Sequence, residues 1–345
     1  MNPSSETQTQ LAEKKAIQRL FAKEASYYMW AGVFVLIVLG AVLGLYYSAM
    51  QIDYTWRWYR VPRYFFYEEA VEVKTEIEGT VASLTREGEN VLVLIKNEGE
   101  EQVFKIPTAG NVSVSEGDLV FQGDALGFYK EWQVGILMQG LWMTLKVSVV
   151  AIFFGILIGL FGGLARVSAN PALRWSSITY IELIRGSPLL VQIFIWYFVL
   201  GTLINTLLTK RGLDTIPPLW FGVAALACFT GAYVAEIVRA GIQSVHRGQT
   251  EAARSLGMNY LQCMAHVILP QAFLRILPPL AGQFISLVKD SSLLGIIAIR
   301  ELTKATREVV TTSLQPFELW FVCALLYLVL TFSLSMFLQY LERKV

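Results

Sequence analysis

Long apolar stretches constrain the fold of this chain more than any other feature. Three of them, residues 25–52, 186–209 and 319–341, carry no charge, and residues 215–235 are equally uncharged. Two more are interrupted only by Lys146 (residues 132–165) and by Lys289 and Asp290 (residues 276–299). A helix needs roughly 20 apolar residues to cross the core of a bilayer. The sequence therefore predicts an α-helical membrane protein with six spans.

The overall composition agrees with a membrane protein and excludes several functions. Only 16% of the residues are charged, whereas a soluble domain has about 25%. The net charge of +1 offers no bulk attraction for nucleic acid. The three cysteines are far apart without a C-x-x-C motif, and the two histidines form no H-E-x-x-H motif. We therefore expect no catalytic residue, no metal site and no cofactor in this chain.

The distribution of Lys and Arg predicts the orientation of the spans. Loops with an excess of these residues stay in the cytoplasm. Four segments on one side of a six-span chain share such an excess, although the other side holds Lys210, Arg211, Arg300, Lys304 and Arg307. Both termini are therefore expected in the cytoplasm. The first span is too long for a signal peptide, and Tyr46 and Tyr47 replace a small-residue cleavage site. The basic residues of the four segments are Lys14, Lys15, Arg19, Lys23, Arg166, Arg174, Arg185, Arg239, Arg247, Arg254, Arg343 and Lys344.

Residues 53–133 differ from the rest of the chain. They hold 15 acidic and 8 basic residues, a net charge of −7. Residues 72–77 have a period of two, with charged side chains at 72, 74 and 76, and residues 91–95 and 102–106 are further short strand-like segments between glycines. This pattern predicts strands joined by turns, in a small antiparallel barrel or sandwich. We expect this insertion on the extracytoplasmic side.

Residues 110–126 of the insertion, GNVSVSEGDLVFQGDAL, resemble the repeat of biotinyl/lipoyl-type barrel-sandwich domains. The lysine that this family modifies in its hairpin turn has no convincing match here. The resemblance therefore implies a structural or docking module. The alternative is a domain that contacts an external binding protein or covers the translocation mouth.

The most informative motif lies between the fourth and fifth spans. It begins Gly248-Gln-Thr-Glu-Ala-Ala-Arg-Ser-Leu-Gly257 and continues to Val267-Ile-Leu-Pro270. The first part favours a helix, Gly257 suits the left-handed residue that ends it, and Asn259 can cap a second helix. Pro270 is expected to interrupt that second helix near the membrane. The result is a short helix with small side chains, which is either a docking element or an ordinary amphipathic loop helix.

This stretch resembles the EAA loop of ABC importer permeases: E-A-A, three residues, Gly, nine residues and I-x-L-P, with Val267 in place of the Ile. In that family the loop is the coupling helix, which inserts into a groove of the ATPase. The resemblance implies an ATPase partner that contacts Glu251, Ala252, Ala253, Arg254, Gly257, Leu269 and Pro270.

Two more segments resemble the permeases of polar amino-acid importers, which carry histidine, glutamate, glutamine, arginine or opines. They are Arg185-Gly-Ser-Pro-Leu-Leu-Val-Gln192 and Thr230-Gly-Ala-Tyr-Val-Ala-Glu-Ile-Val-Arg239. Physically, a Gly and a Pro at 186 and 188 break the helix where the third span begins. Residues 236 and 239 either form an ion pair at a helix end or brace the coupling loop. The family signature comprises Arg185, Gly186, Pro188, Gln192, Tyr233, Glu236 and Arg239.

The resemblance covers roughly residues 135–343 and implies a three-part organisation. Residues 1–52 form a cytoplasmic tail and an extra first span, and residues 53–133 form the β insertion. Residues 134–345 form a five-span permease core with the coupling loop at 241–270. Glycines spaced four apart in the second span (Gly155, Gly159, Gly163) allow close helix packing, either within the chain or in the dimer that such permeases form.

Lys289 and Asp290 are adjacent charges deep inside an apolar span, and charge inside a membrane indicates function. Lys289 would face the carboxylate of an amino acid and Asp290 its ammonium, or the two would pair with each other. The serines nearby supply hydroxyl groups, and in the resembling permeases Lys-Asp-(Ser/Thr)-Ser contributes to the substrate cavity. The expected pocket is Lys289, Asp290, Ser291, Ser292 and Ser286.

No G-x-x-x-x-G-K-[ST] loop exists in this chain, so it cannot cradle a nucleotide phosphate in that way. The resemblance therefore places ATP and Mg²⁺ on a partner ATPase. It also implies a second permease subunit, identical or different, an extracytoplasmic substrate-binding protein and a location in the bacterial inner membrane. A membrane enzyme would need clustered catalytic groups, a channel would need no coupling helix, and an anchored sensor would not need five further spans.

Overall fold

The computed structural model describes residues 3–97, 99–107 and 110–344, and it describes side chains from residue 27 onwards. The side chains of Lys14, Lys15, Arg19 and Lys23, on which part of the predicted orientation depends, lie outside the described ones. The chain divides into two compact units, Met1–Arg57 and Trp58–Val345.

The first unit is formed by α1 (Pro3–Gln51). Its segment Tyr27–Gln51 is long and apolar enough to cross a membrane, and the side chains of that segment are almost all exposed. A helix with apolar residues on every side is suited to lipid. The predicted first span is confirmed as a span-length apolar helix.

The second unit begins with η1 (Trp58–Tyr64) and two small antiparallel sheets. The order of strands is β1-β7-β5 in one sheet and β4-β3-β2-β6 in the other. Val93, Ile95, Ile106 and Leu126 are fully buried in a shared apolar core. The predicted small β domain is thus confirmed. Its strands are β1 (Phe66–Lys74), β2 (Gly79–Glu87), β3 (Asn90–Lys96), β4 (Glu101–Pro107), β5 (Asn111–Val112), β6 (Leu119–Val120) and β7 (Ala125–Val134).

One of the predicted strands is displaced. Residues 91–95 and 102–106 lie in β3 and β4 as predicted, but β1 ends at Lys74 instead of continuing to Ile77. The Thr75 hydroxyl donates to the Ile77 carbonyl oxygen (2.5 Å), while the Thr75 backbone N–H donates to Asp124. These bonds turn the chain, because a threonine that bonds to nearby backbone competes with strand pairing.

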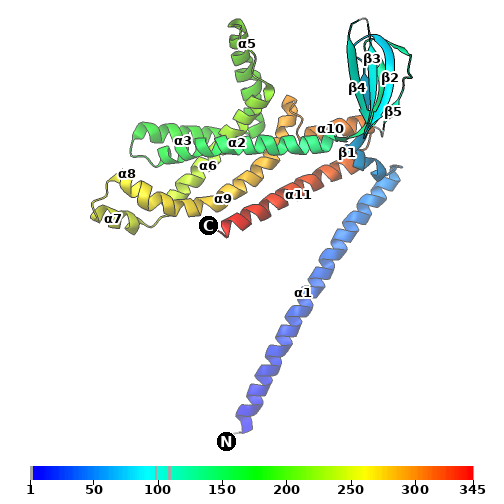
Figure 1. Cartoon of the computed structure of the whole chain (residues 1–345). Helices are drawn as coiled ribbons and strands as arrows, with labels where there is room; N and C mark the ends of the chain where they lie inside the picture. The colour runs from blue at the N-terminus through cyan, green and yellow to red at the C-terminus, as the bar shows by residue number, and fades with distance from the viewer. Residues whose placement is uncertain (1–2, 98, 108–109, 345) are drawn as a thin grey trace. The chain divides into compact units, whose positions relative to one another are not determined.

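The rest of the second unit is helical (Figure 1). Its first half contains α2 (Ile136–Arg166), α3 (Pro171–Arg185), α4 (Leu189–Phe194), the π-helical η2 (Ile195–Gly201), α5 (Thr202–Lys210) and α6 (Pro218–Gln243). Its second half contains α7 (Arg247–Ser255), α8 (Tyr260–Cys263), the π-helical η3 (Met264–Ile268), α9 (Leu269–Asp290), η4 (Ser291–Ile297), α10 (Leu302–Ser313) and α11 (Pro316–Glu342).

Six helices of the described structure are long and apolar enough to span a membrane, which confirms the predicted number. Five belong to the second unit, and α6 is the most buried of them. Gly155, Gly159 and Gly163 of α2 lie against α6, where a Cβ at Gly159 would approach Val234 to 2.4 Å. The glycine spacing therefore serves packing of α2 on α6 within the chain, which is one of the two roles that the sequence left open.

Two segments are more helical than the sequence indicated. The basic stretch after α2 contains a second helix, α3, which packs on α2 and α6 and is fixed by a hydrogen bond from Ser177 Oγ to the Gly162 carbonyl (2.7 Å). Asn170 caps α3 through the backbone N–H of Ala172, and Pro171 at the first helical position favours the start of a helix there. The fourth span also continues eight residues beyond its predicted end at residue 235, as α6 ends at Gln243.

Candidate functional site

The predicted coupling loop forms two short helices joined by a tight turn. His246 caps α7 by accepting a hydrogen bond from the Gly248 backbone at Nδ1 (3.1 Å). Gly257 follows α7 with a φ of 83°, a conformation that suits glycine because it has no Cβ. Asn259 and Gln262 then form a reciprocal capping box at the start of α8. The predicted helix, left-handed turn and capped second helix are all present.

The two faces of α7 have different environments. Ala253 is only 4% exposed and packs in an apolar cluster with Ile242, Cys263 and Ile268. Glu251, Ala252, Arg254 and Gly257 are exposed. Leu256 and Leu261 are 81% and 75% exposed. One face of α7 therefore anchors the helix, and the other presents small, charged and apolar groups to the outside.

Pro270 does not interrupt the second helix, contrary to the prediction. One helical segment runs from Tyr260 to Ile297, and Pro270 is the second residue of α9 within it. The π-helical η3 immediately precedes α9, and a wider helical turn of this kind accommodates a residue that lacks an N–H donor. Leu269 is half-buried and Pro270 is exposed, and both lie inside this continuous helical segment rather than at a break.

Besides the apolar cluster, polar contacts connect α9 both to α7 and to the end of α6. Gln271 Nε2 of α9 donates to Gln249 Oε1 of α7 (3.3 Å). Arg275 of α9 donates to the carbonyl oxygen of Ser244 at the end of α6. A displacement of α7 would therefore move α9 through the Gln249–Gln271 contact, and α6 through the apolar cluster that contains Ala253 and Ile242.

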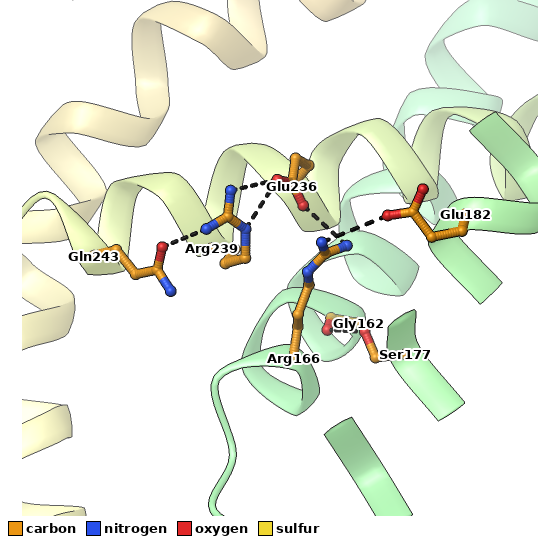
Figure 2. A network of polar contacts seen from close by, with 7 residues as sticks. All are labelled: Gly162, Arg166, Ser177, Glu182, Glu236, Arg239 and Gln243. Atoms are coloured by element: carbon orange, nitrogen blue, oxygen red, sulfur yellow. Dashed lines mark hydrogen bonds and ion pairs between the residues drawn. The ribbon is translucent and has the colours of Figure 1, made fainter. Parts of the chain in front are cut away.

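A polar network that includes the signature residues Glu236 and Arg239 joins α2, α3 and α6 (Figure 2). Arg166 Nη1 lies 3.2 Å from Glu236 Oε2, and Arg166 Nη2 lies 3.6 Å from Glu182 Oε1. Arg239 Nε donates to Glu236 Oε1 (2.9 Å), and Arg239 also bonds to Gln243. Glu236 thus holds two arginines, one from its own helix and one from α2.

This network corrects the predicted position of Glu236 and Arg239. The ion pair exists, but it lies within α6 and not at a helix end, because α6 continues to Gln243. Arg166 and Glu182 were not among the predicted site residues. Arg166 is the last residue of α2, and its position at the end of an apolar span was the one feature of the sequence that could have marked it as a site residue. No feature of the sequence marked Glu182.

The break before the third span is held by Gln192. Gly186 ends α3 and Pro188 precedes α4, as predicted. Gln192 is 4% exposed, and its Nε2 donates to the carbonyl oxygens of Ile184 (2.7 Å) and Ser187 (3.2 Å). Pro188 has no N–H to donate to the Ile184 carbonyl, so the buried amide and the Ser187 hydroxyl (3.4 Å) supply its hydrogen bonds at the break. Arg185 extends from this break over the ring of Tyr233, 5.2 Å from its centroid.

The predicted pocket residues do not all face one space. Lys289 and Ser292 line a cavity of about 270 Å³ together with Thr303 and with Trp320, Cys323, Ala324 and Tyr327 of α11. Asp290, Ser286 and Ser291 are not among the residues that line this cavity. Ser291 is buried, and its hydroxyl donates to the Val288 carbonyl (2.8 Å). Within the described structure Lys289 and Asp290 form no ion pair with each other.

A buried carboxylate that the sequence did not single out lies next to this cavity. Glu301 is fully buried and caps α10 through the backbone N–H groups of Thr303 (2.8 Å) and Lys304 (2.7 Å). Tyr327 donates to Glu301 Oε2 (3.0 Å). The pKa of Glu301 is raised by burial, and the hydrogen bonds from Thr303, Lys304 and Tyr327 offset this only in part. Glu301 therefore fixes two residues of the cavity wall, Thr303 and Tyr327.

Among the described residues, no group of three or more His, Cys, Asp or Glu side chains is arranged to hold a metal ion.

Comparison with known proteins connects this arrangement to transport. Residues 151–345 match the family described as binding-protein-dependent transport system inner membrane component. The probable glutamine ABC transporter permease protein GlnM of Bacillus subtilis (strain 168) is 41% identical over 207 residues, covering 60% of this chain and 92% of the relative. The glutamine transport system permease protein GlnP of Escherichia coli (strain K12) is 36% identical, covering 61% and 93%.

Solved structures show the same helical arrangement. A crystal structure of an amino acid ABC transporter with histidines superposes with a TM-score of 0.54 at 40% identity, covering 61% of this chain and 94% of the other. An inward-facing structure of the MetNI methionine ABC transporter gives a TM-score of 0.52 at 21% identity, covering 61% and 95%. The latter supports the fold alone. The family match, residues 151–345, lies within the helical portion of the second unit.

Proposed function

Because the chain belongs to the family of binding-protein-dependent transport system inner membrane components, and is thus a permease subunit of an ABC transporter, we propose that it imports a polar amino acid. The carrying observation is the 41% identity to a probable glutamine permease over nearly all of that relative's length. Further relatives are permeases named for L-cystine and arginine transport. The exposed face of α7, with Glu251 and Leu256 outside and Ala253 buried, supports an ATP-driven mechanism.

An ABC importer permease works with an ATPase and a substrate-binding protein. We propose that two ATPase subunits dock on the coupling helices of two permease subunits, the second being a copy of this chain or a related one. When the ATPase subunits close on ATP, they pull α7, which moves α6 and α9 through Ala253 and the Gln249–Gln271 contact. The substrate cavity then changes from outward to inward access, a population shift driven by differential binding of ATP.

The proposed orientation follows from the arginines near α7 and α3. Arg174, Arg247 and Arg254 lie on one side of the spans, and the positive-inside rule assigns that side to the cytoplasm. Both termini would then be cytoplasmic, and the β domain between α1 and α2 would be extracytoplasmic. The bacterial inner membrane is the corresponding location. ATP and Mg²⁺ would be bound by the ATPase.

We assign the contact with the substrate carboxylate to Lys289. Lys289 and Ser292 line the cavity beside α10 and α11, and a lysine ammonium group forms charge-assisted hydrogen bonds with a carboxylate. Asp290 keeps its predicted role as the partner of the substrate ammonium, and Ser286 and Ser291 remain part of the predicted pocket. The lining of the cavity supports Lys289 and Ser292 most directly.

The Gly257→Ala variant tests the coupling role of α7. We expect ATP-driven glutamine uptake into proteoliposomes, measured with the assembled transporter and its binding protein, to fall at least about tenfold. An alanine at a φ of 83° raises the backbone conformational energy by roughly 1–2 kcal/mol. A backbone that relaxes this strain would change the orientation of α7, which the ATPase contacts. Uptake independent of ATP would instead indicate a channel.

Gly212→Ala is the matched control. Gly212 also has a positive φ (70°), and at both positions an added Cβ would meet no other atom within 4 Å. Gly212 lies between α5 and α6, away from the coupling loop in the sequence. The two variants should therefore be strained alike, and only Gly257→Ala should lose uptake. Equal uptake in both would refute the coupling role.

The Lys289→Met variant tests the assignment of the carboxylate contact. We expect the concentration of glutamine that half-stimulates the ATPase to rise at least about tenfold, because one charge-assisted hydrogen bond contributes roughly 1.5–3 kcal/mol. Glutamine amide, which lacks the carboxylate, should stimulate wild type and variant equally weakly. The assignment is wrong if the variant responds to glutamine as the wild type does. Lys210→Met, at the exposed end of α5, serves as the control for loss of a lysine.

A further inference from the structure

A large cavity lies beside α7, where several helices end. Its volume is about 710 Å³. It is lined by Arg166 at the end of α2, Arg174 of α3, Ile242 near the end of α6, Arg247 of α7 and Tyr260 at the start of α8, among others. Five helices thus contribute to one hollow, of which α7 forms one wall.

The cavity carries a positive charge that the protein does not neutralise. Four arginines line it, and the described lining includes no acidic residue. Arg166 is paired with Glu236 and Glu182. In the described part of the chain, the side chains of Arg174, Arg247 and Arg254 form no ion pair or hydrogen bond. Glu251 is the nearest acid in sequence on α7, and it is not paired with either arginine of that helix in the described structure.

The level of the cavity follows from the helices that end there. The candidate spans Ile136–Arg166 and Pro218–Gln243 finish at lining residues, and the span that starts at Tyr260 begins at one. The cavity therefore lies at the surface of the membrane, where lipid headgroups are found. Leu173 and Trp175, on either side of Arg174, are 52% and 69% exposed. Exposed aromatic and aliphatic residues next to arginines are typical of helices at this depth.

We propose that this cavity binds the phosphate of an anionic membrane lipid. Arg174, Arg247 and Arg254 would hold the phosphate oxygens, because a guanidinium group presents paired N–H donors that match phosphate geometry. Basic pockets between membrane helices on the cytoplasmic side bind such headgroups. A lipid in this place would tie α7 to the ends of α2 and α3 and would make coupled transport depend on anionic lipid. The proposal needs the membrane location of the chain but not the identity of the transported solute.

The experiment uses the full chain in detergent with added lipid, observed by native mass spectrometry. Phosphatidylglycerol should remain bound about tenfold more than phosphatidylcholine. The double variant Arg174→Gln/Arg247→Gln should lose this preference. The matched control Arg343→Gln/Lys344→Gln, which removes two basic residues at the end of α11 outside the cavity, should keep it. Equal retention of both lipids by the wild type, or an unchanged preference in the cavity variant, would overturn the proposal.

Two further measurements test whether the cavity binds something other than a lipid. If inorganic phosphate at millimolar concentration displaces phosphatidylglycerol from the wild type, the site takes a soluble anion and the lipid assignment is wrong. If the cavity variant keeps its lipid preference but no longer copurifies with the ATPase, the arginines belong to that interface instead. Thr250→Trp, which places a large side chain in the cavity wall, replaces the double variant if the latter does not fold; it should exclude the lipid, and retained preference would overturn the proposal.

Discussion

The Glu236→Ala variant should lose most coupled uptake and about 3 kcal/mol of stability. Glu236 contacts both Arg166 of α2 and Arg239 of α6. Removing it leaves two arginines, with side chains only 18% and 28% exposed, without their main partner. The cost of removing one member of a buried ion pair is roughly 3–5 kcal/mol, and partial exposure places this case at the low end. Thermal unfolding in detergent and uptake in proteoliposomes measure the two effects.

A carboxylate on the protein surface provides the control for this variant. Glu72 pairs with Lys74 (3.3 Å), and both side chains are more than half exposed, so this ion pair contributes only about 0–1 kcal/mol. Glu72→Ala should therefore unfold close to the wild-type temperature. If Glu236→Ala were as mild as Glu72→Ala, the network in Figure 2 would not brace the helices. Glu236→Gln, which keeps a hydrogen-bond acceptor for Arg239, should be intermediate.

The Gly159→Ala variant should destabilise the packing of α2 on α6 by roughly 1–3 kcal/mol or more. An added Cβ would lie 2.4 Å from Cβ and Cγ1 of Val234 and 2.9 Å from the carbonyl oxygen of Gly231. Val234 is fully buried, so neither its side chain nor the backbone of α6 can move without opening the interface. We expect a lower unfolding temperature in detergent and less folded protein in the membrane.

A Gly→Ala substitution at another helical glycine should have the opposite effect on stability. A Cβ at Gly282 of α9 would meet no other atom within 4 Å, and an alanine is about 0.8–1 kcal/mol more favourable than glycine inside a helix. Gly282→Ala should therefore leave the purified chain as stable as the wild type or more so. Equal unfolding temperatures for the two variants would show that α2 and α6 do not approach as closely as the structure has them.

The predicted features that the structure and comparisons confirm depend on residues close together in the sequence. A span is recognised by about 20 apolar residues in a row, and six such helices are present. The turn at Gly257 and the capping box at Asn259 follow from the conformational preferences of a few neighbouring residues. The EAA loop is equally local, and its resemblance to ABC permeases agrees with the family that the chain matches.

Other features were decided by contacts between distant segments. Arg166 and Glu236 belong to different helices and meet only because glycines let α2 approach α6 closely. The continuation of the helix through Pro270 depends on a π-helical turn, and local proline preference argued against it. Lys289 shares a cavity with α11, whereas Asp290, its neighbour in sequence, does not line it.

The sequence by itself determined the number of spans, the coupling loop and the class of protein, because each depends on hydrophobicity or backbone preference within a short window. The tertiary structure decided which polar groups meet, which face of α7 is free and which side chains line the cavities. These depend on how closely helices approach and how they are rotated about their axes. Side-chain packing between segments far apart in the chain sets that geometry.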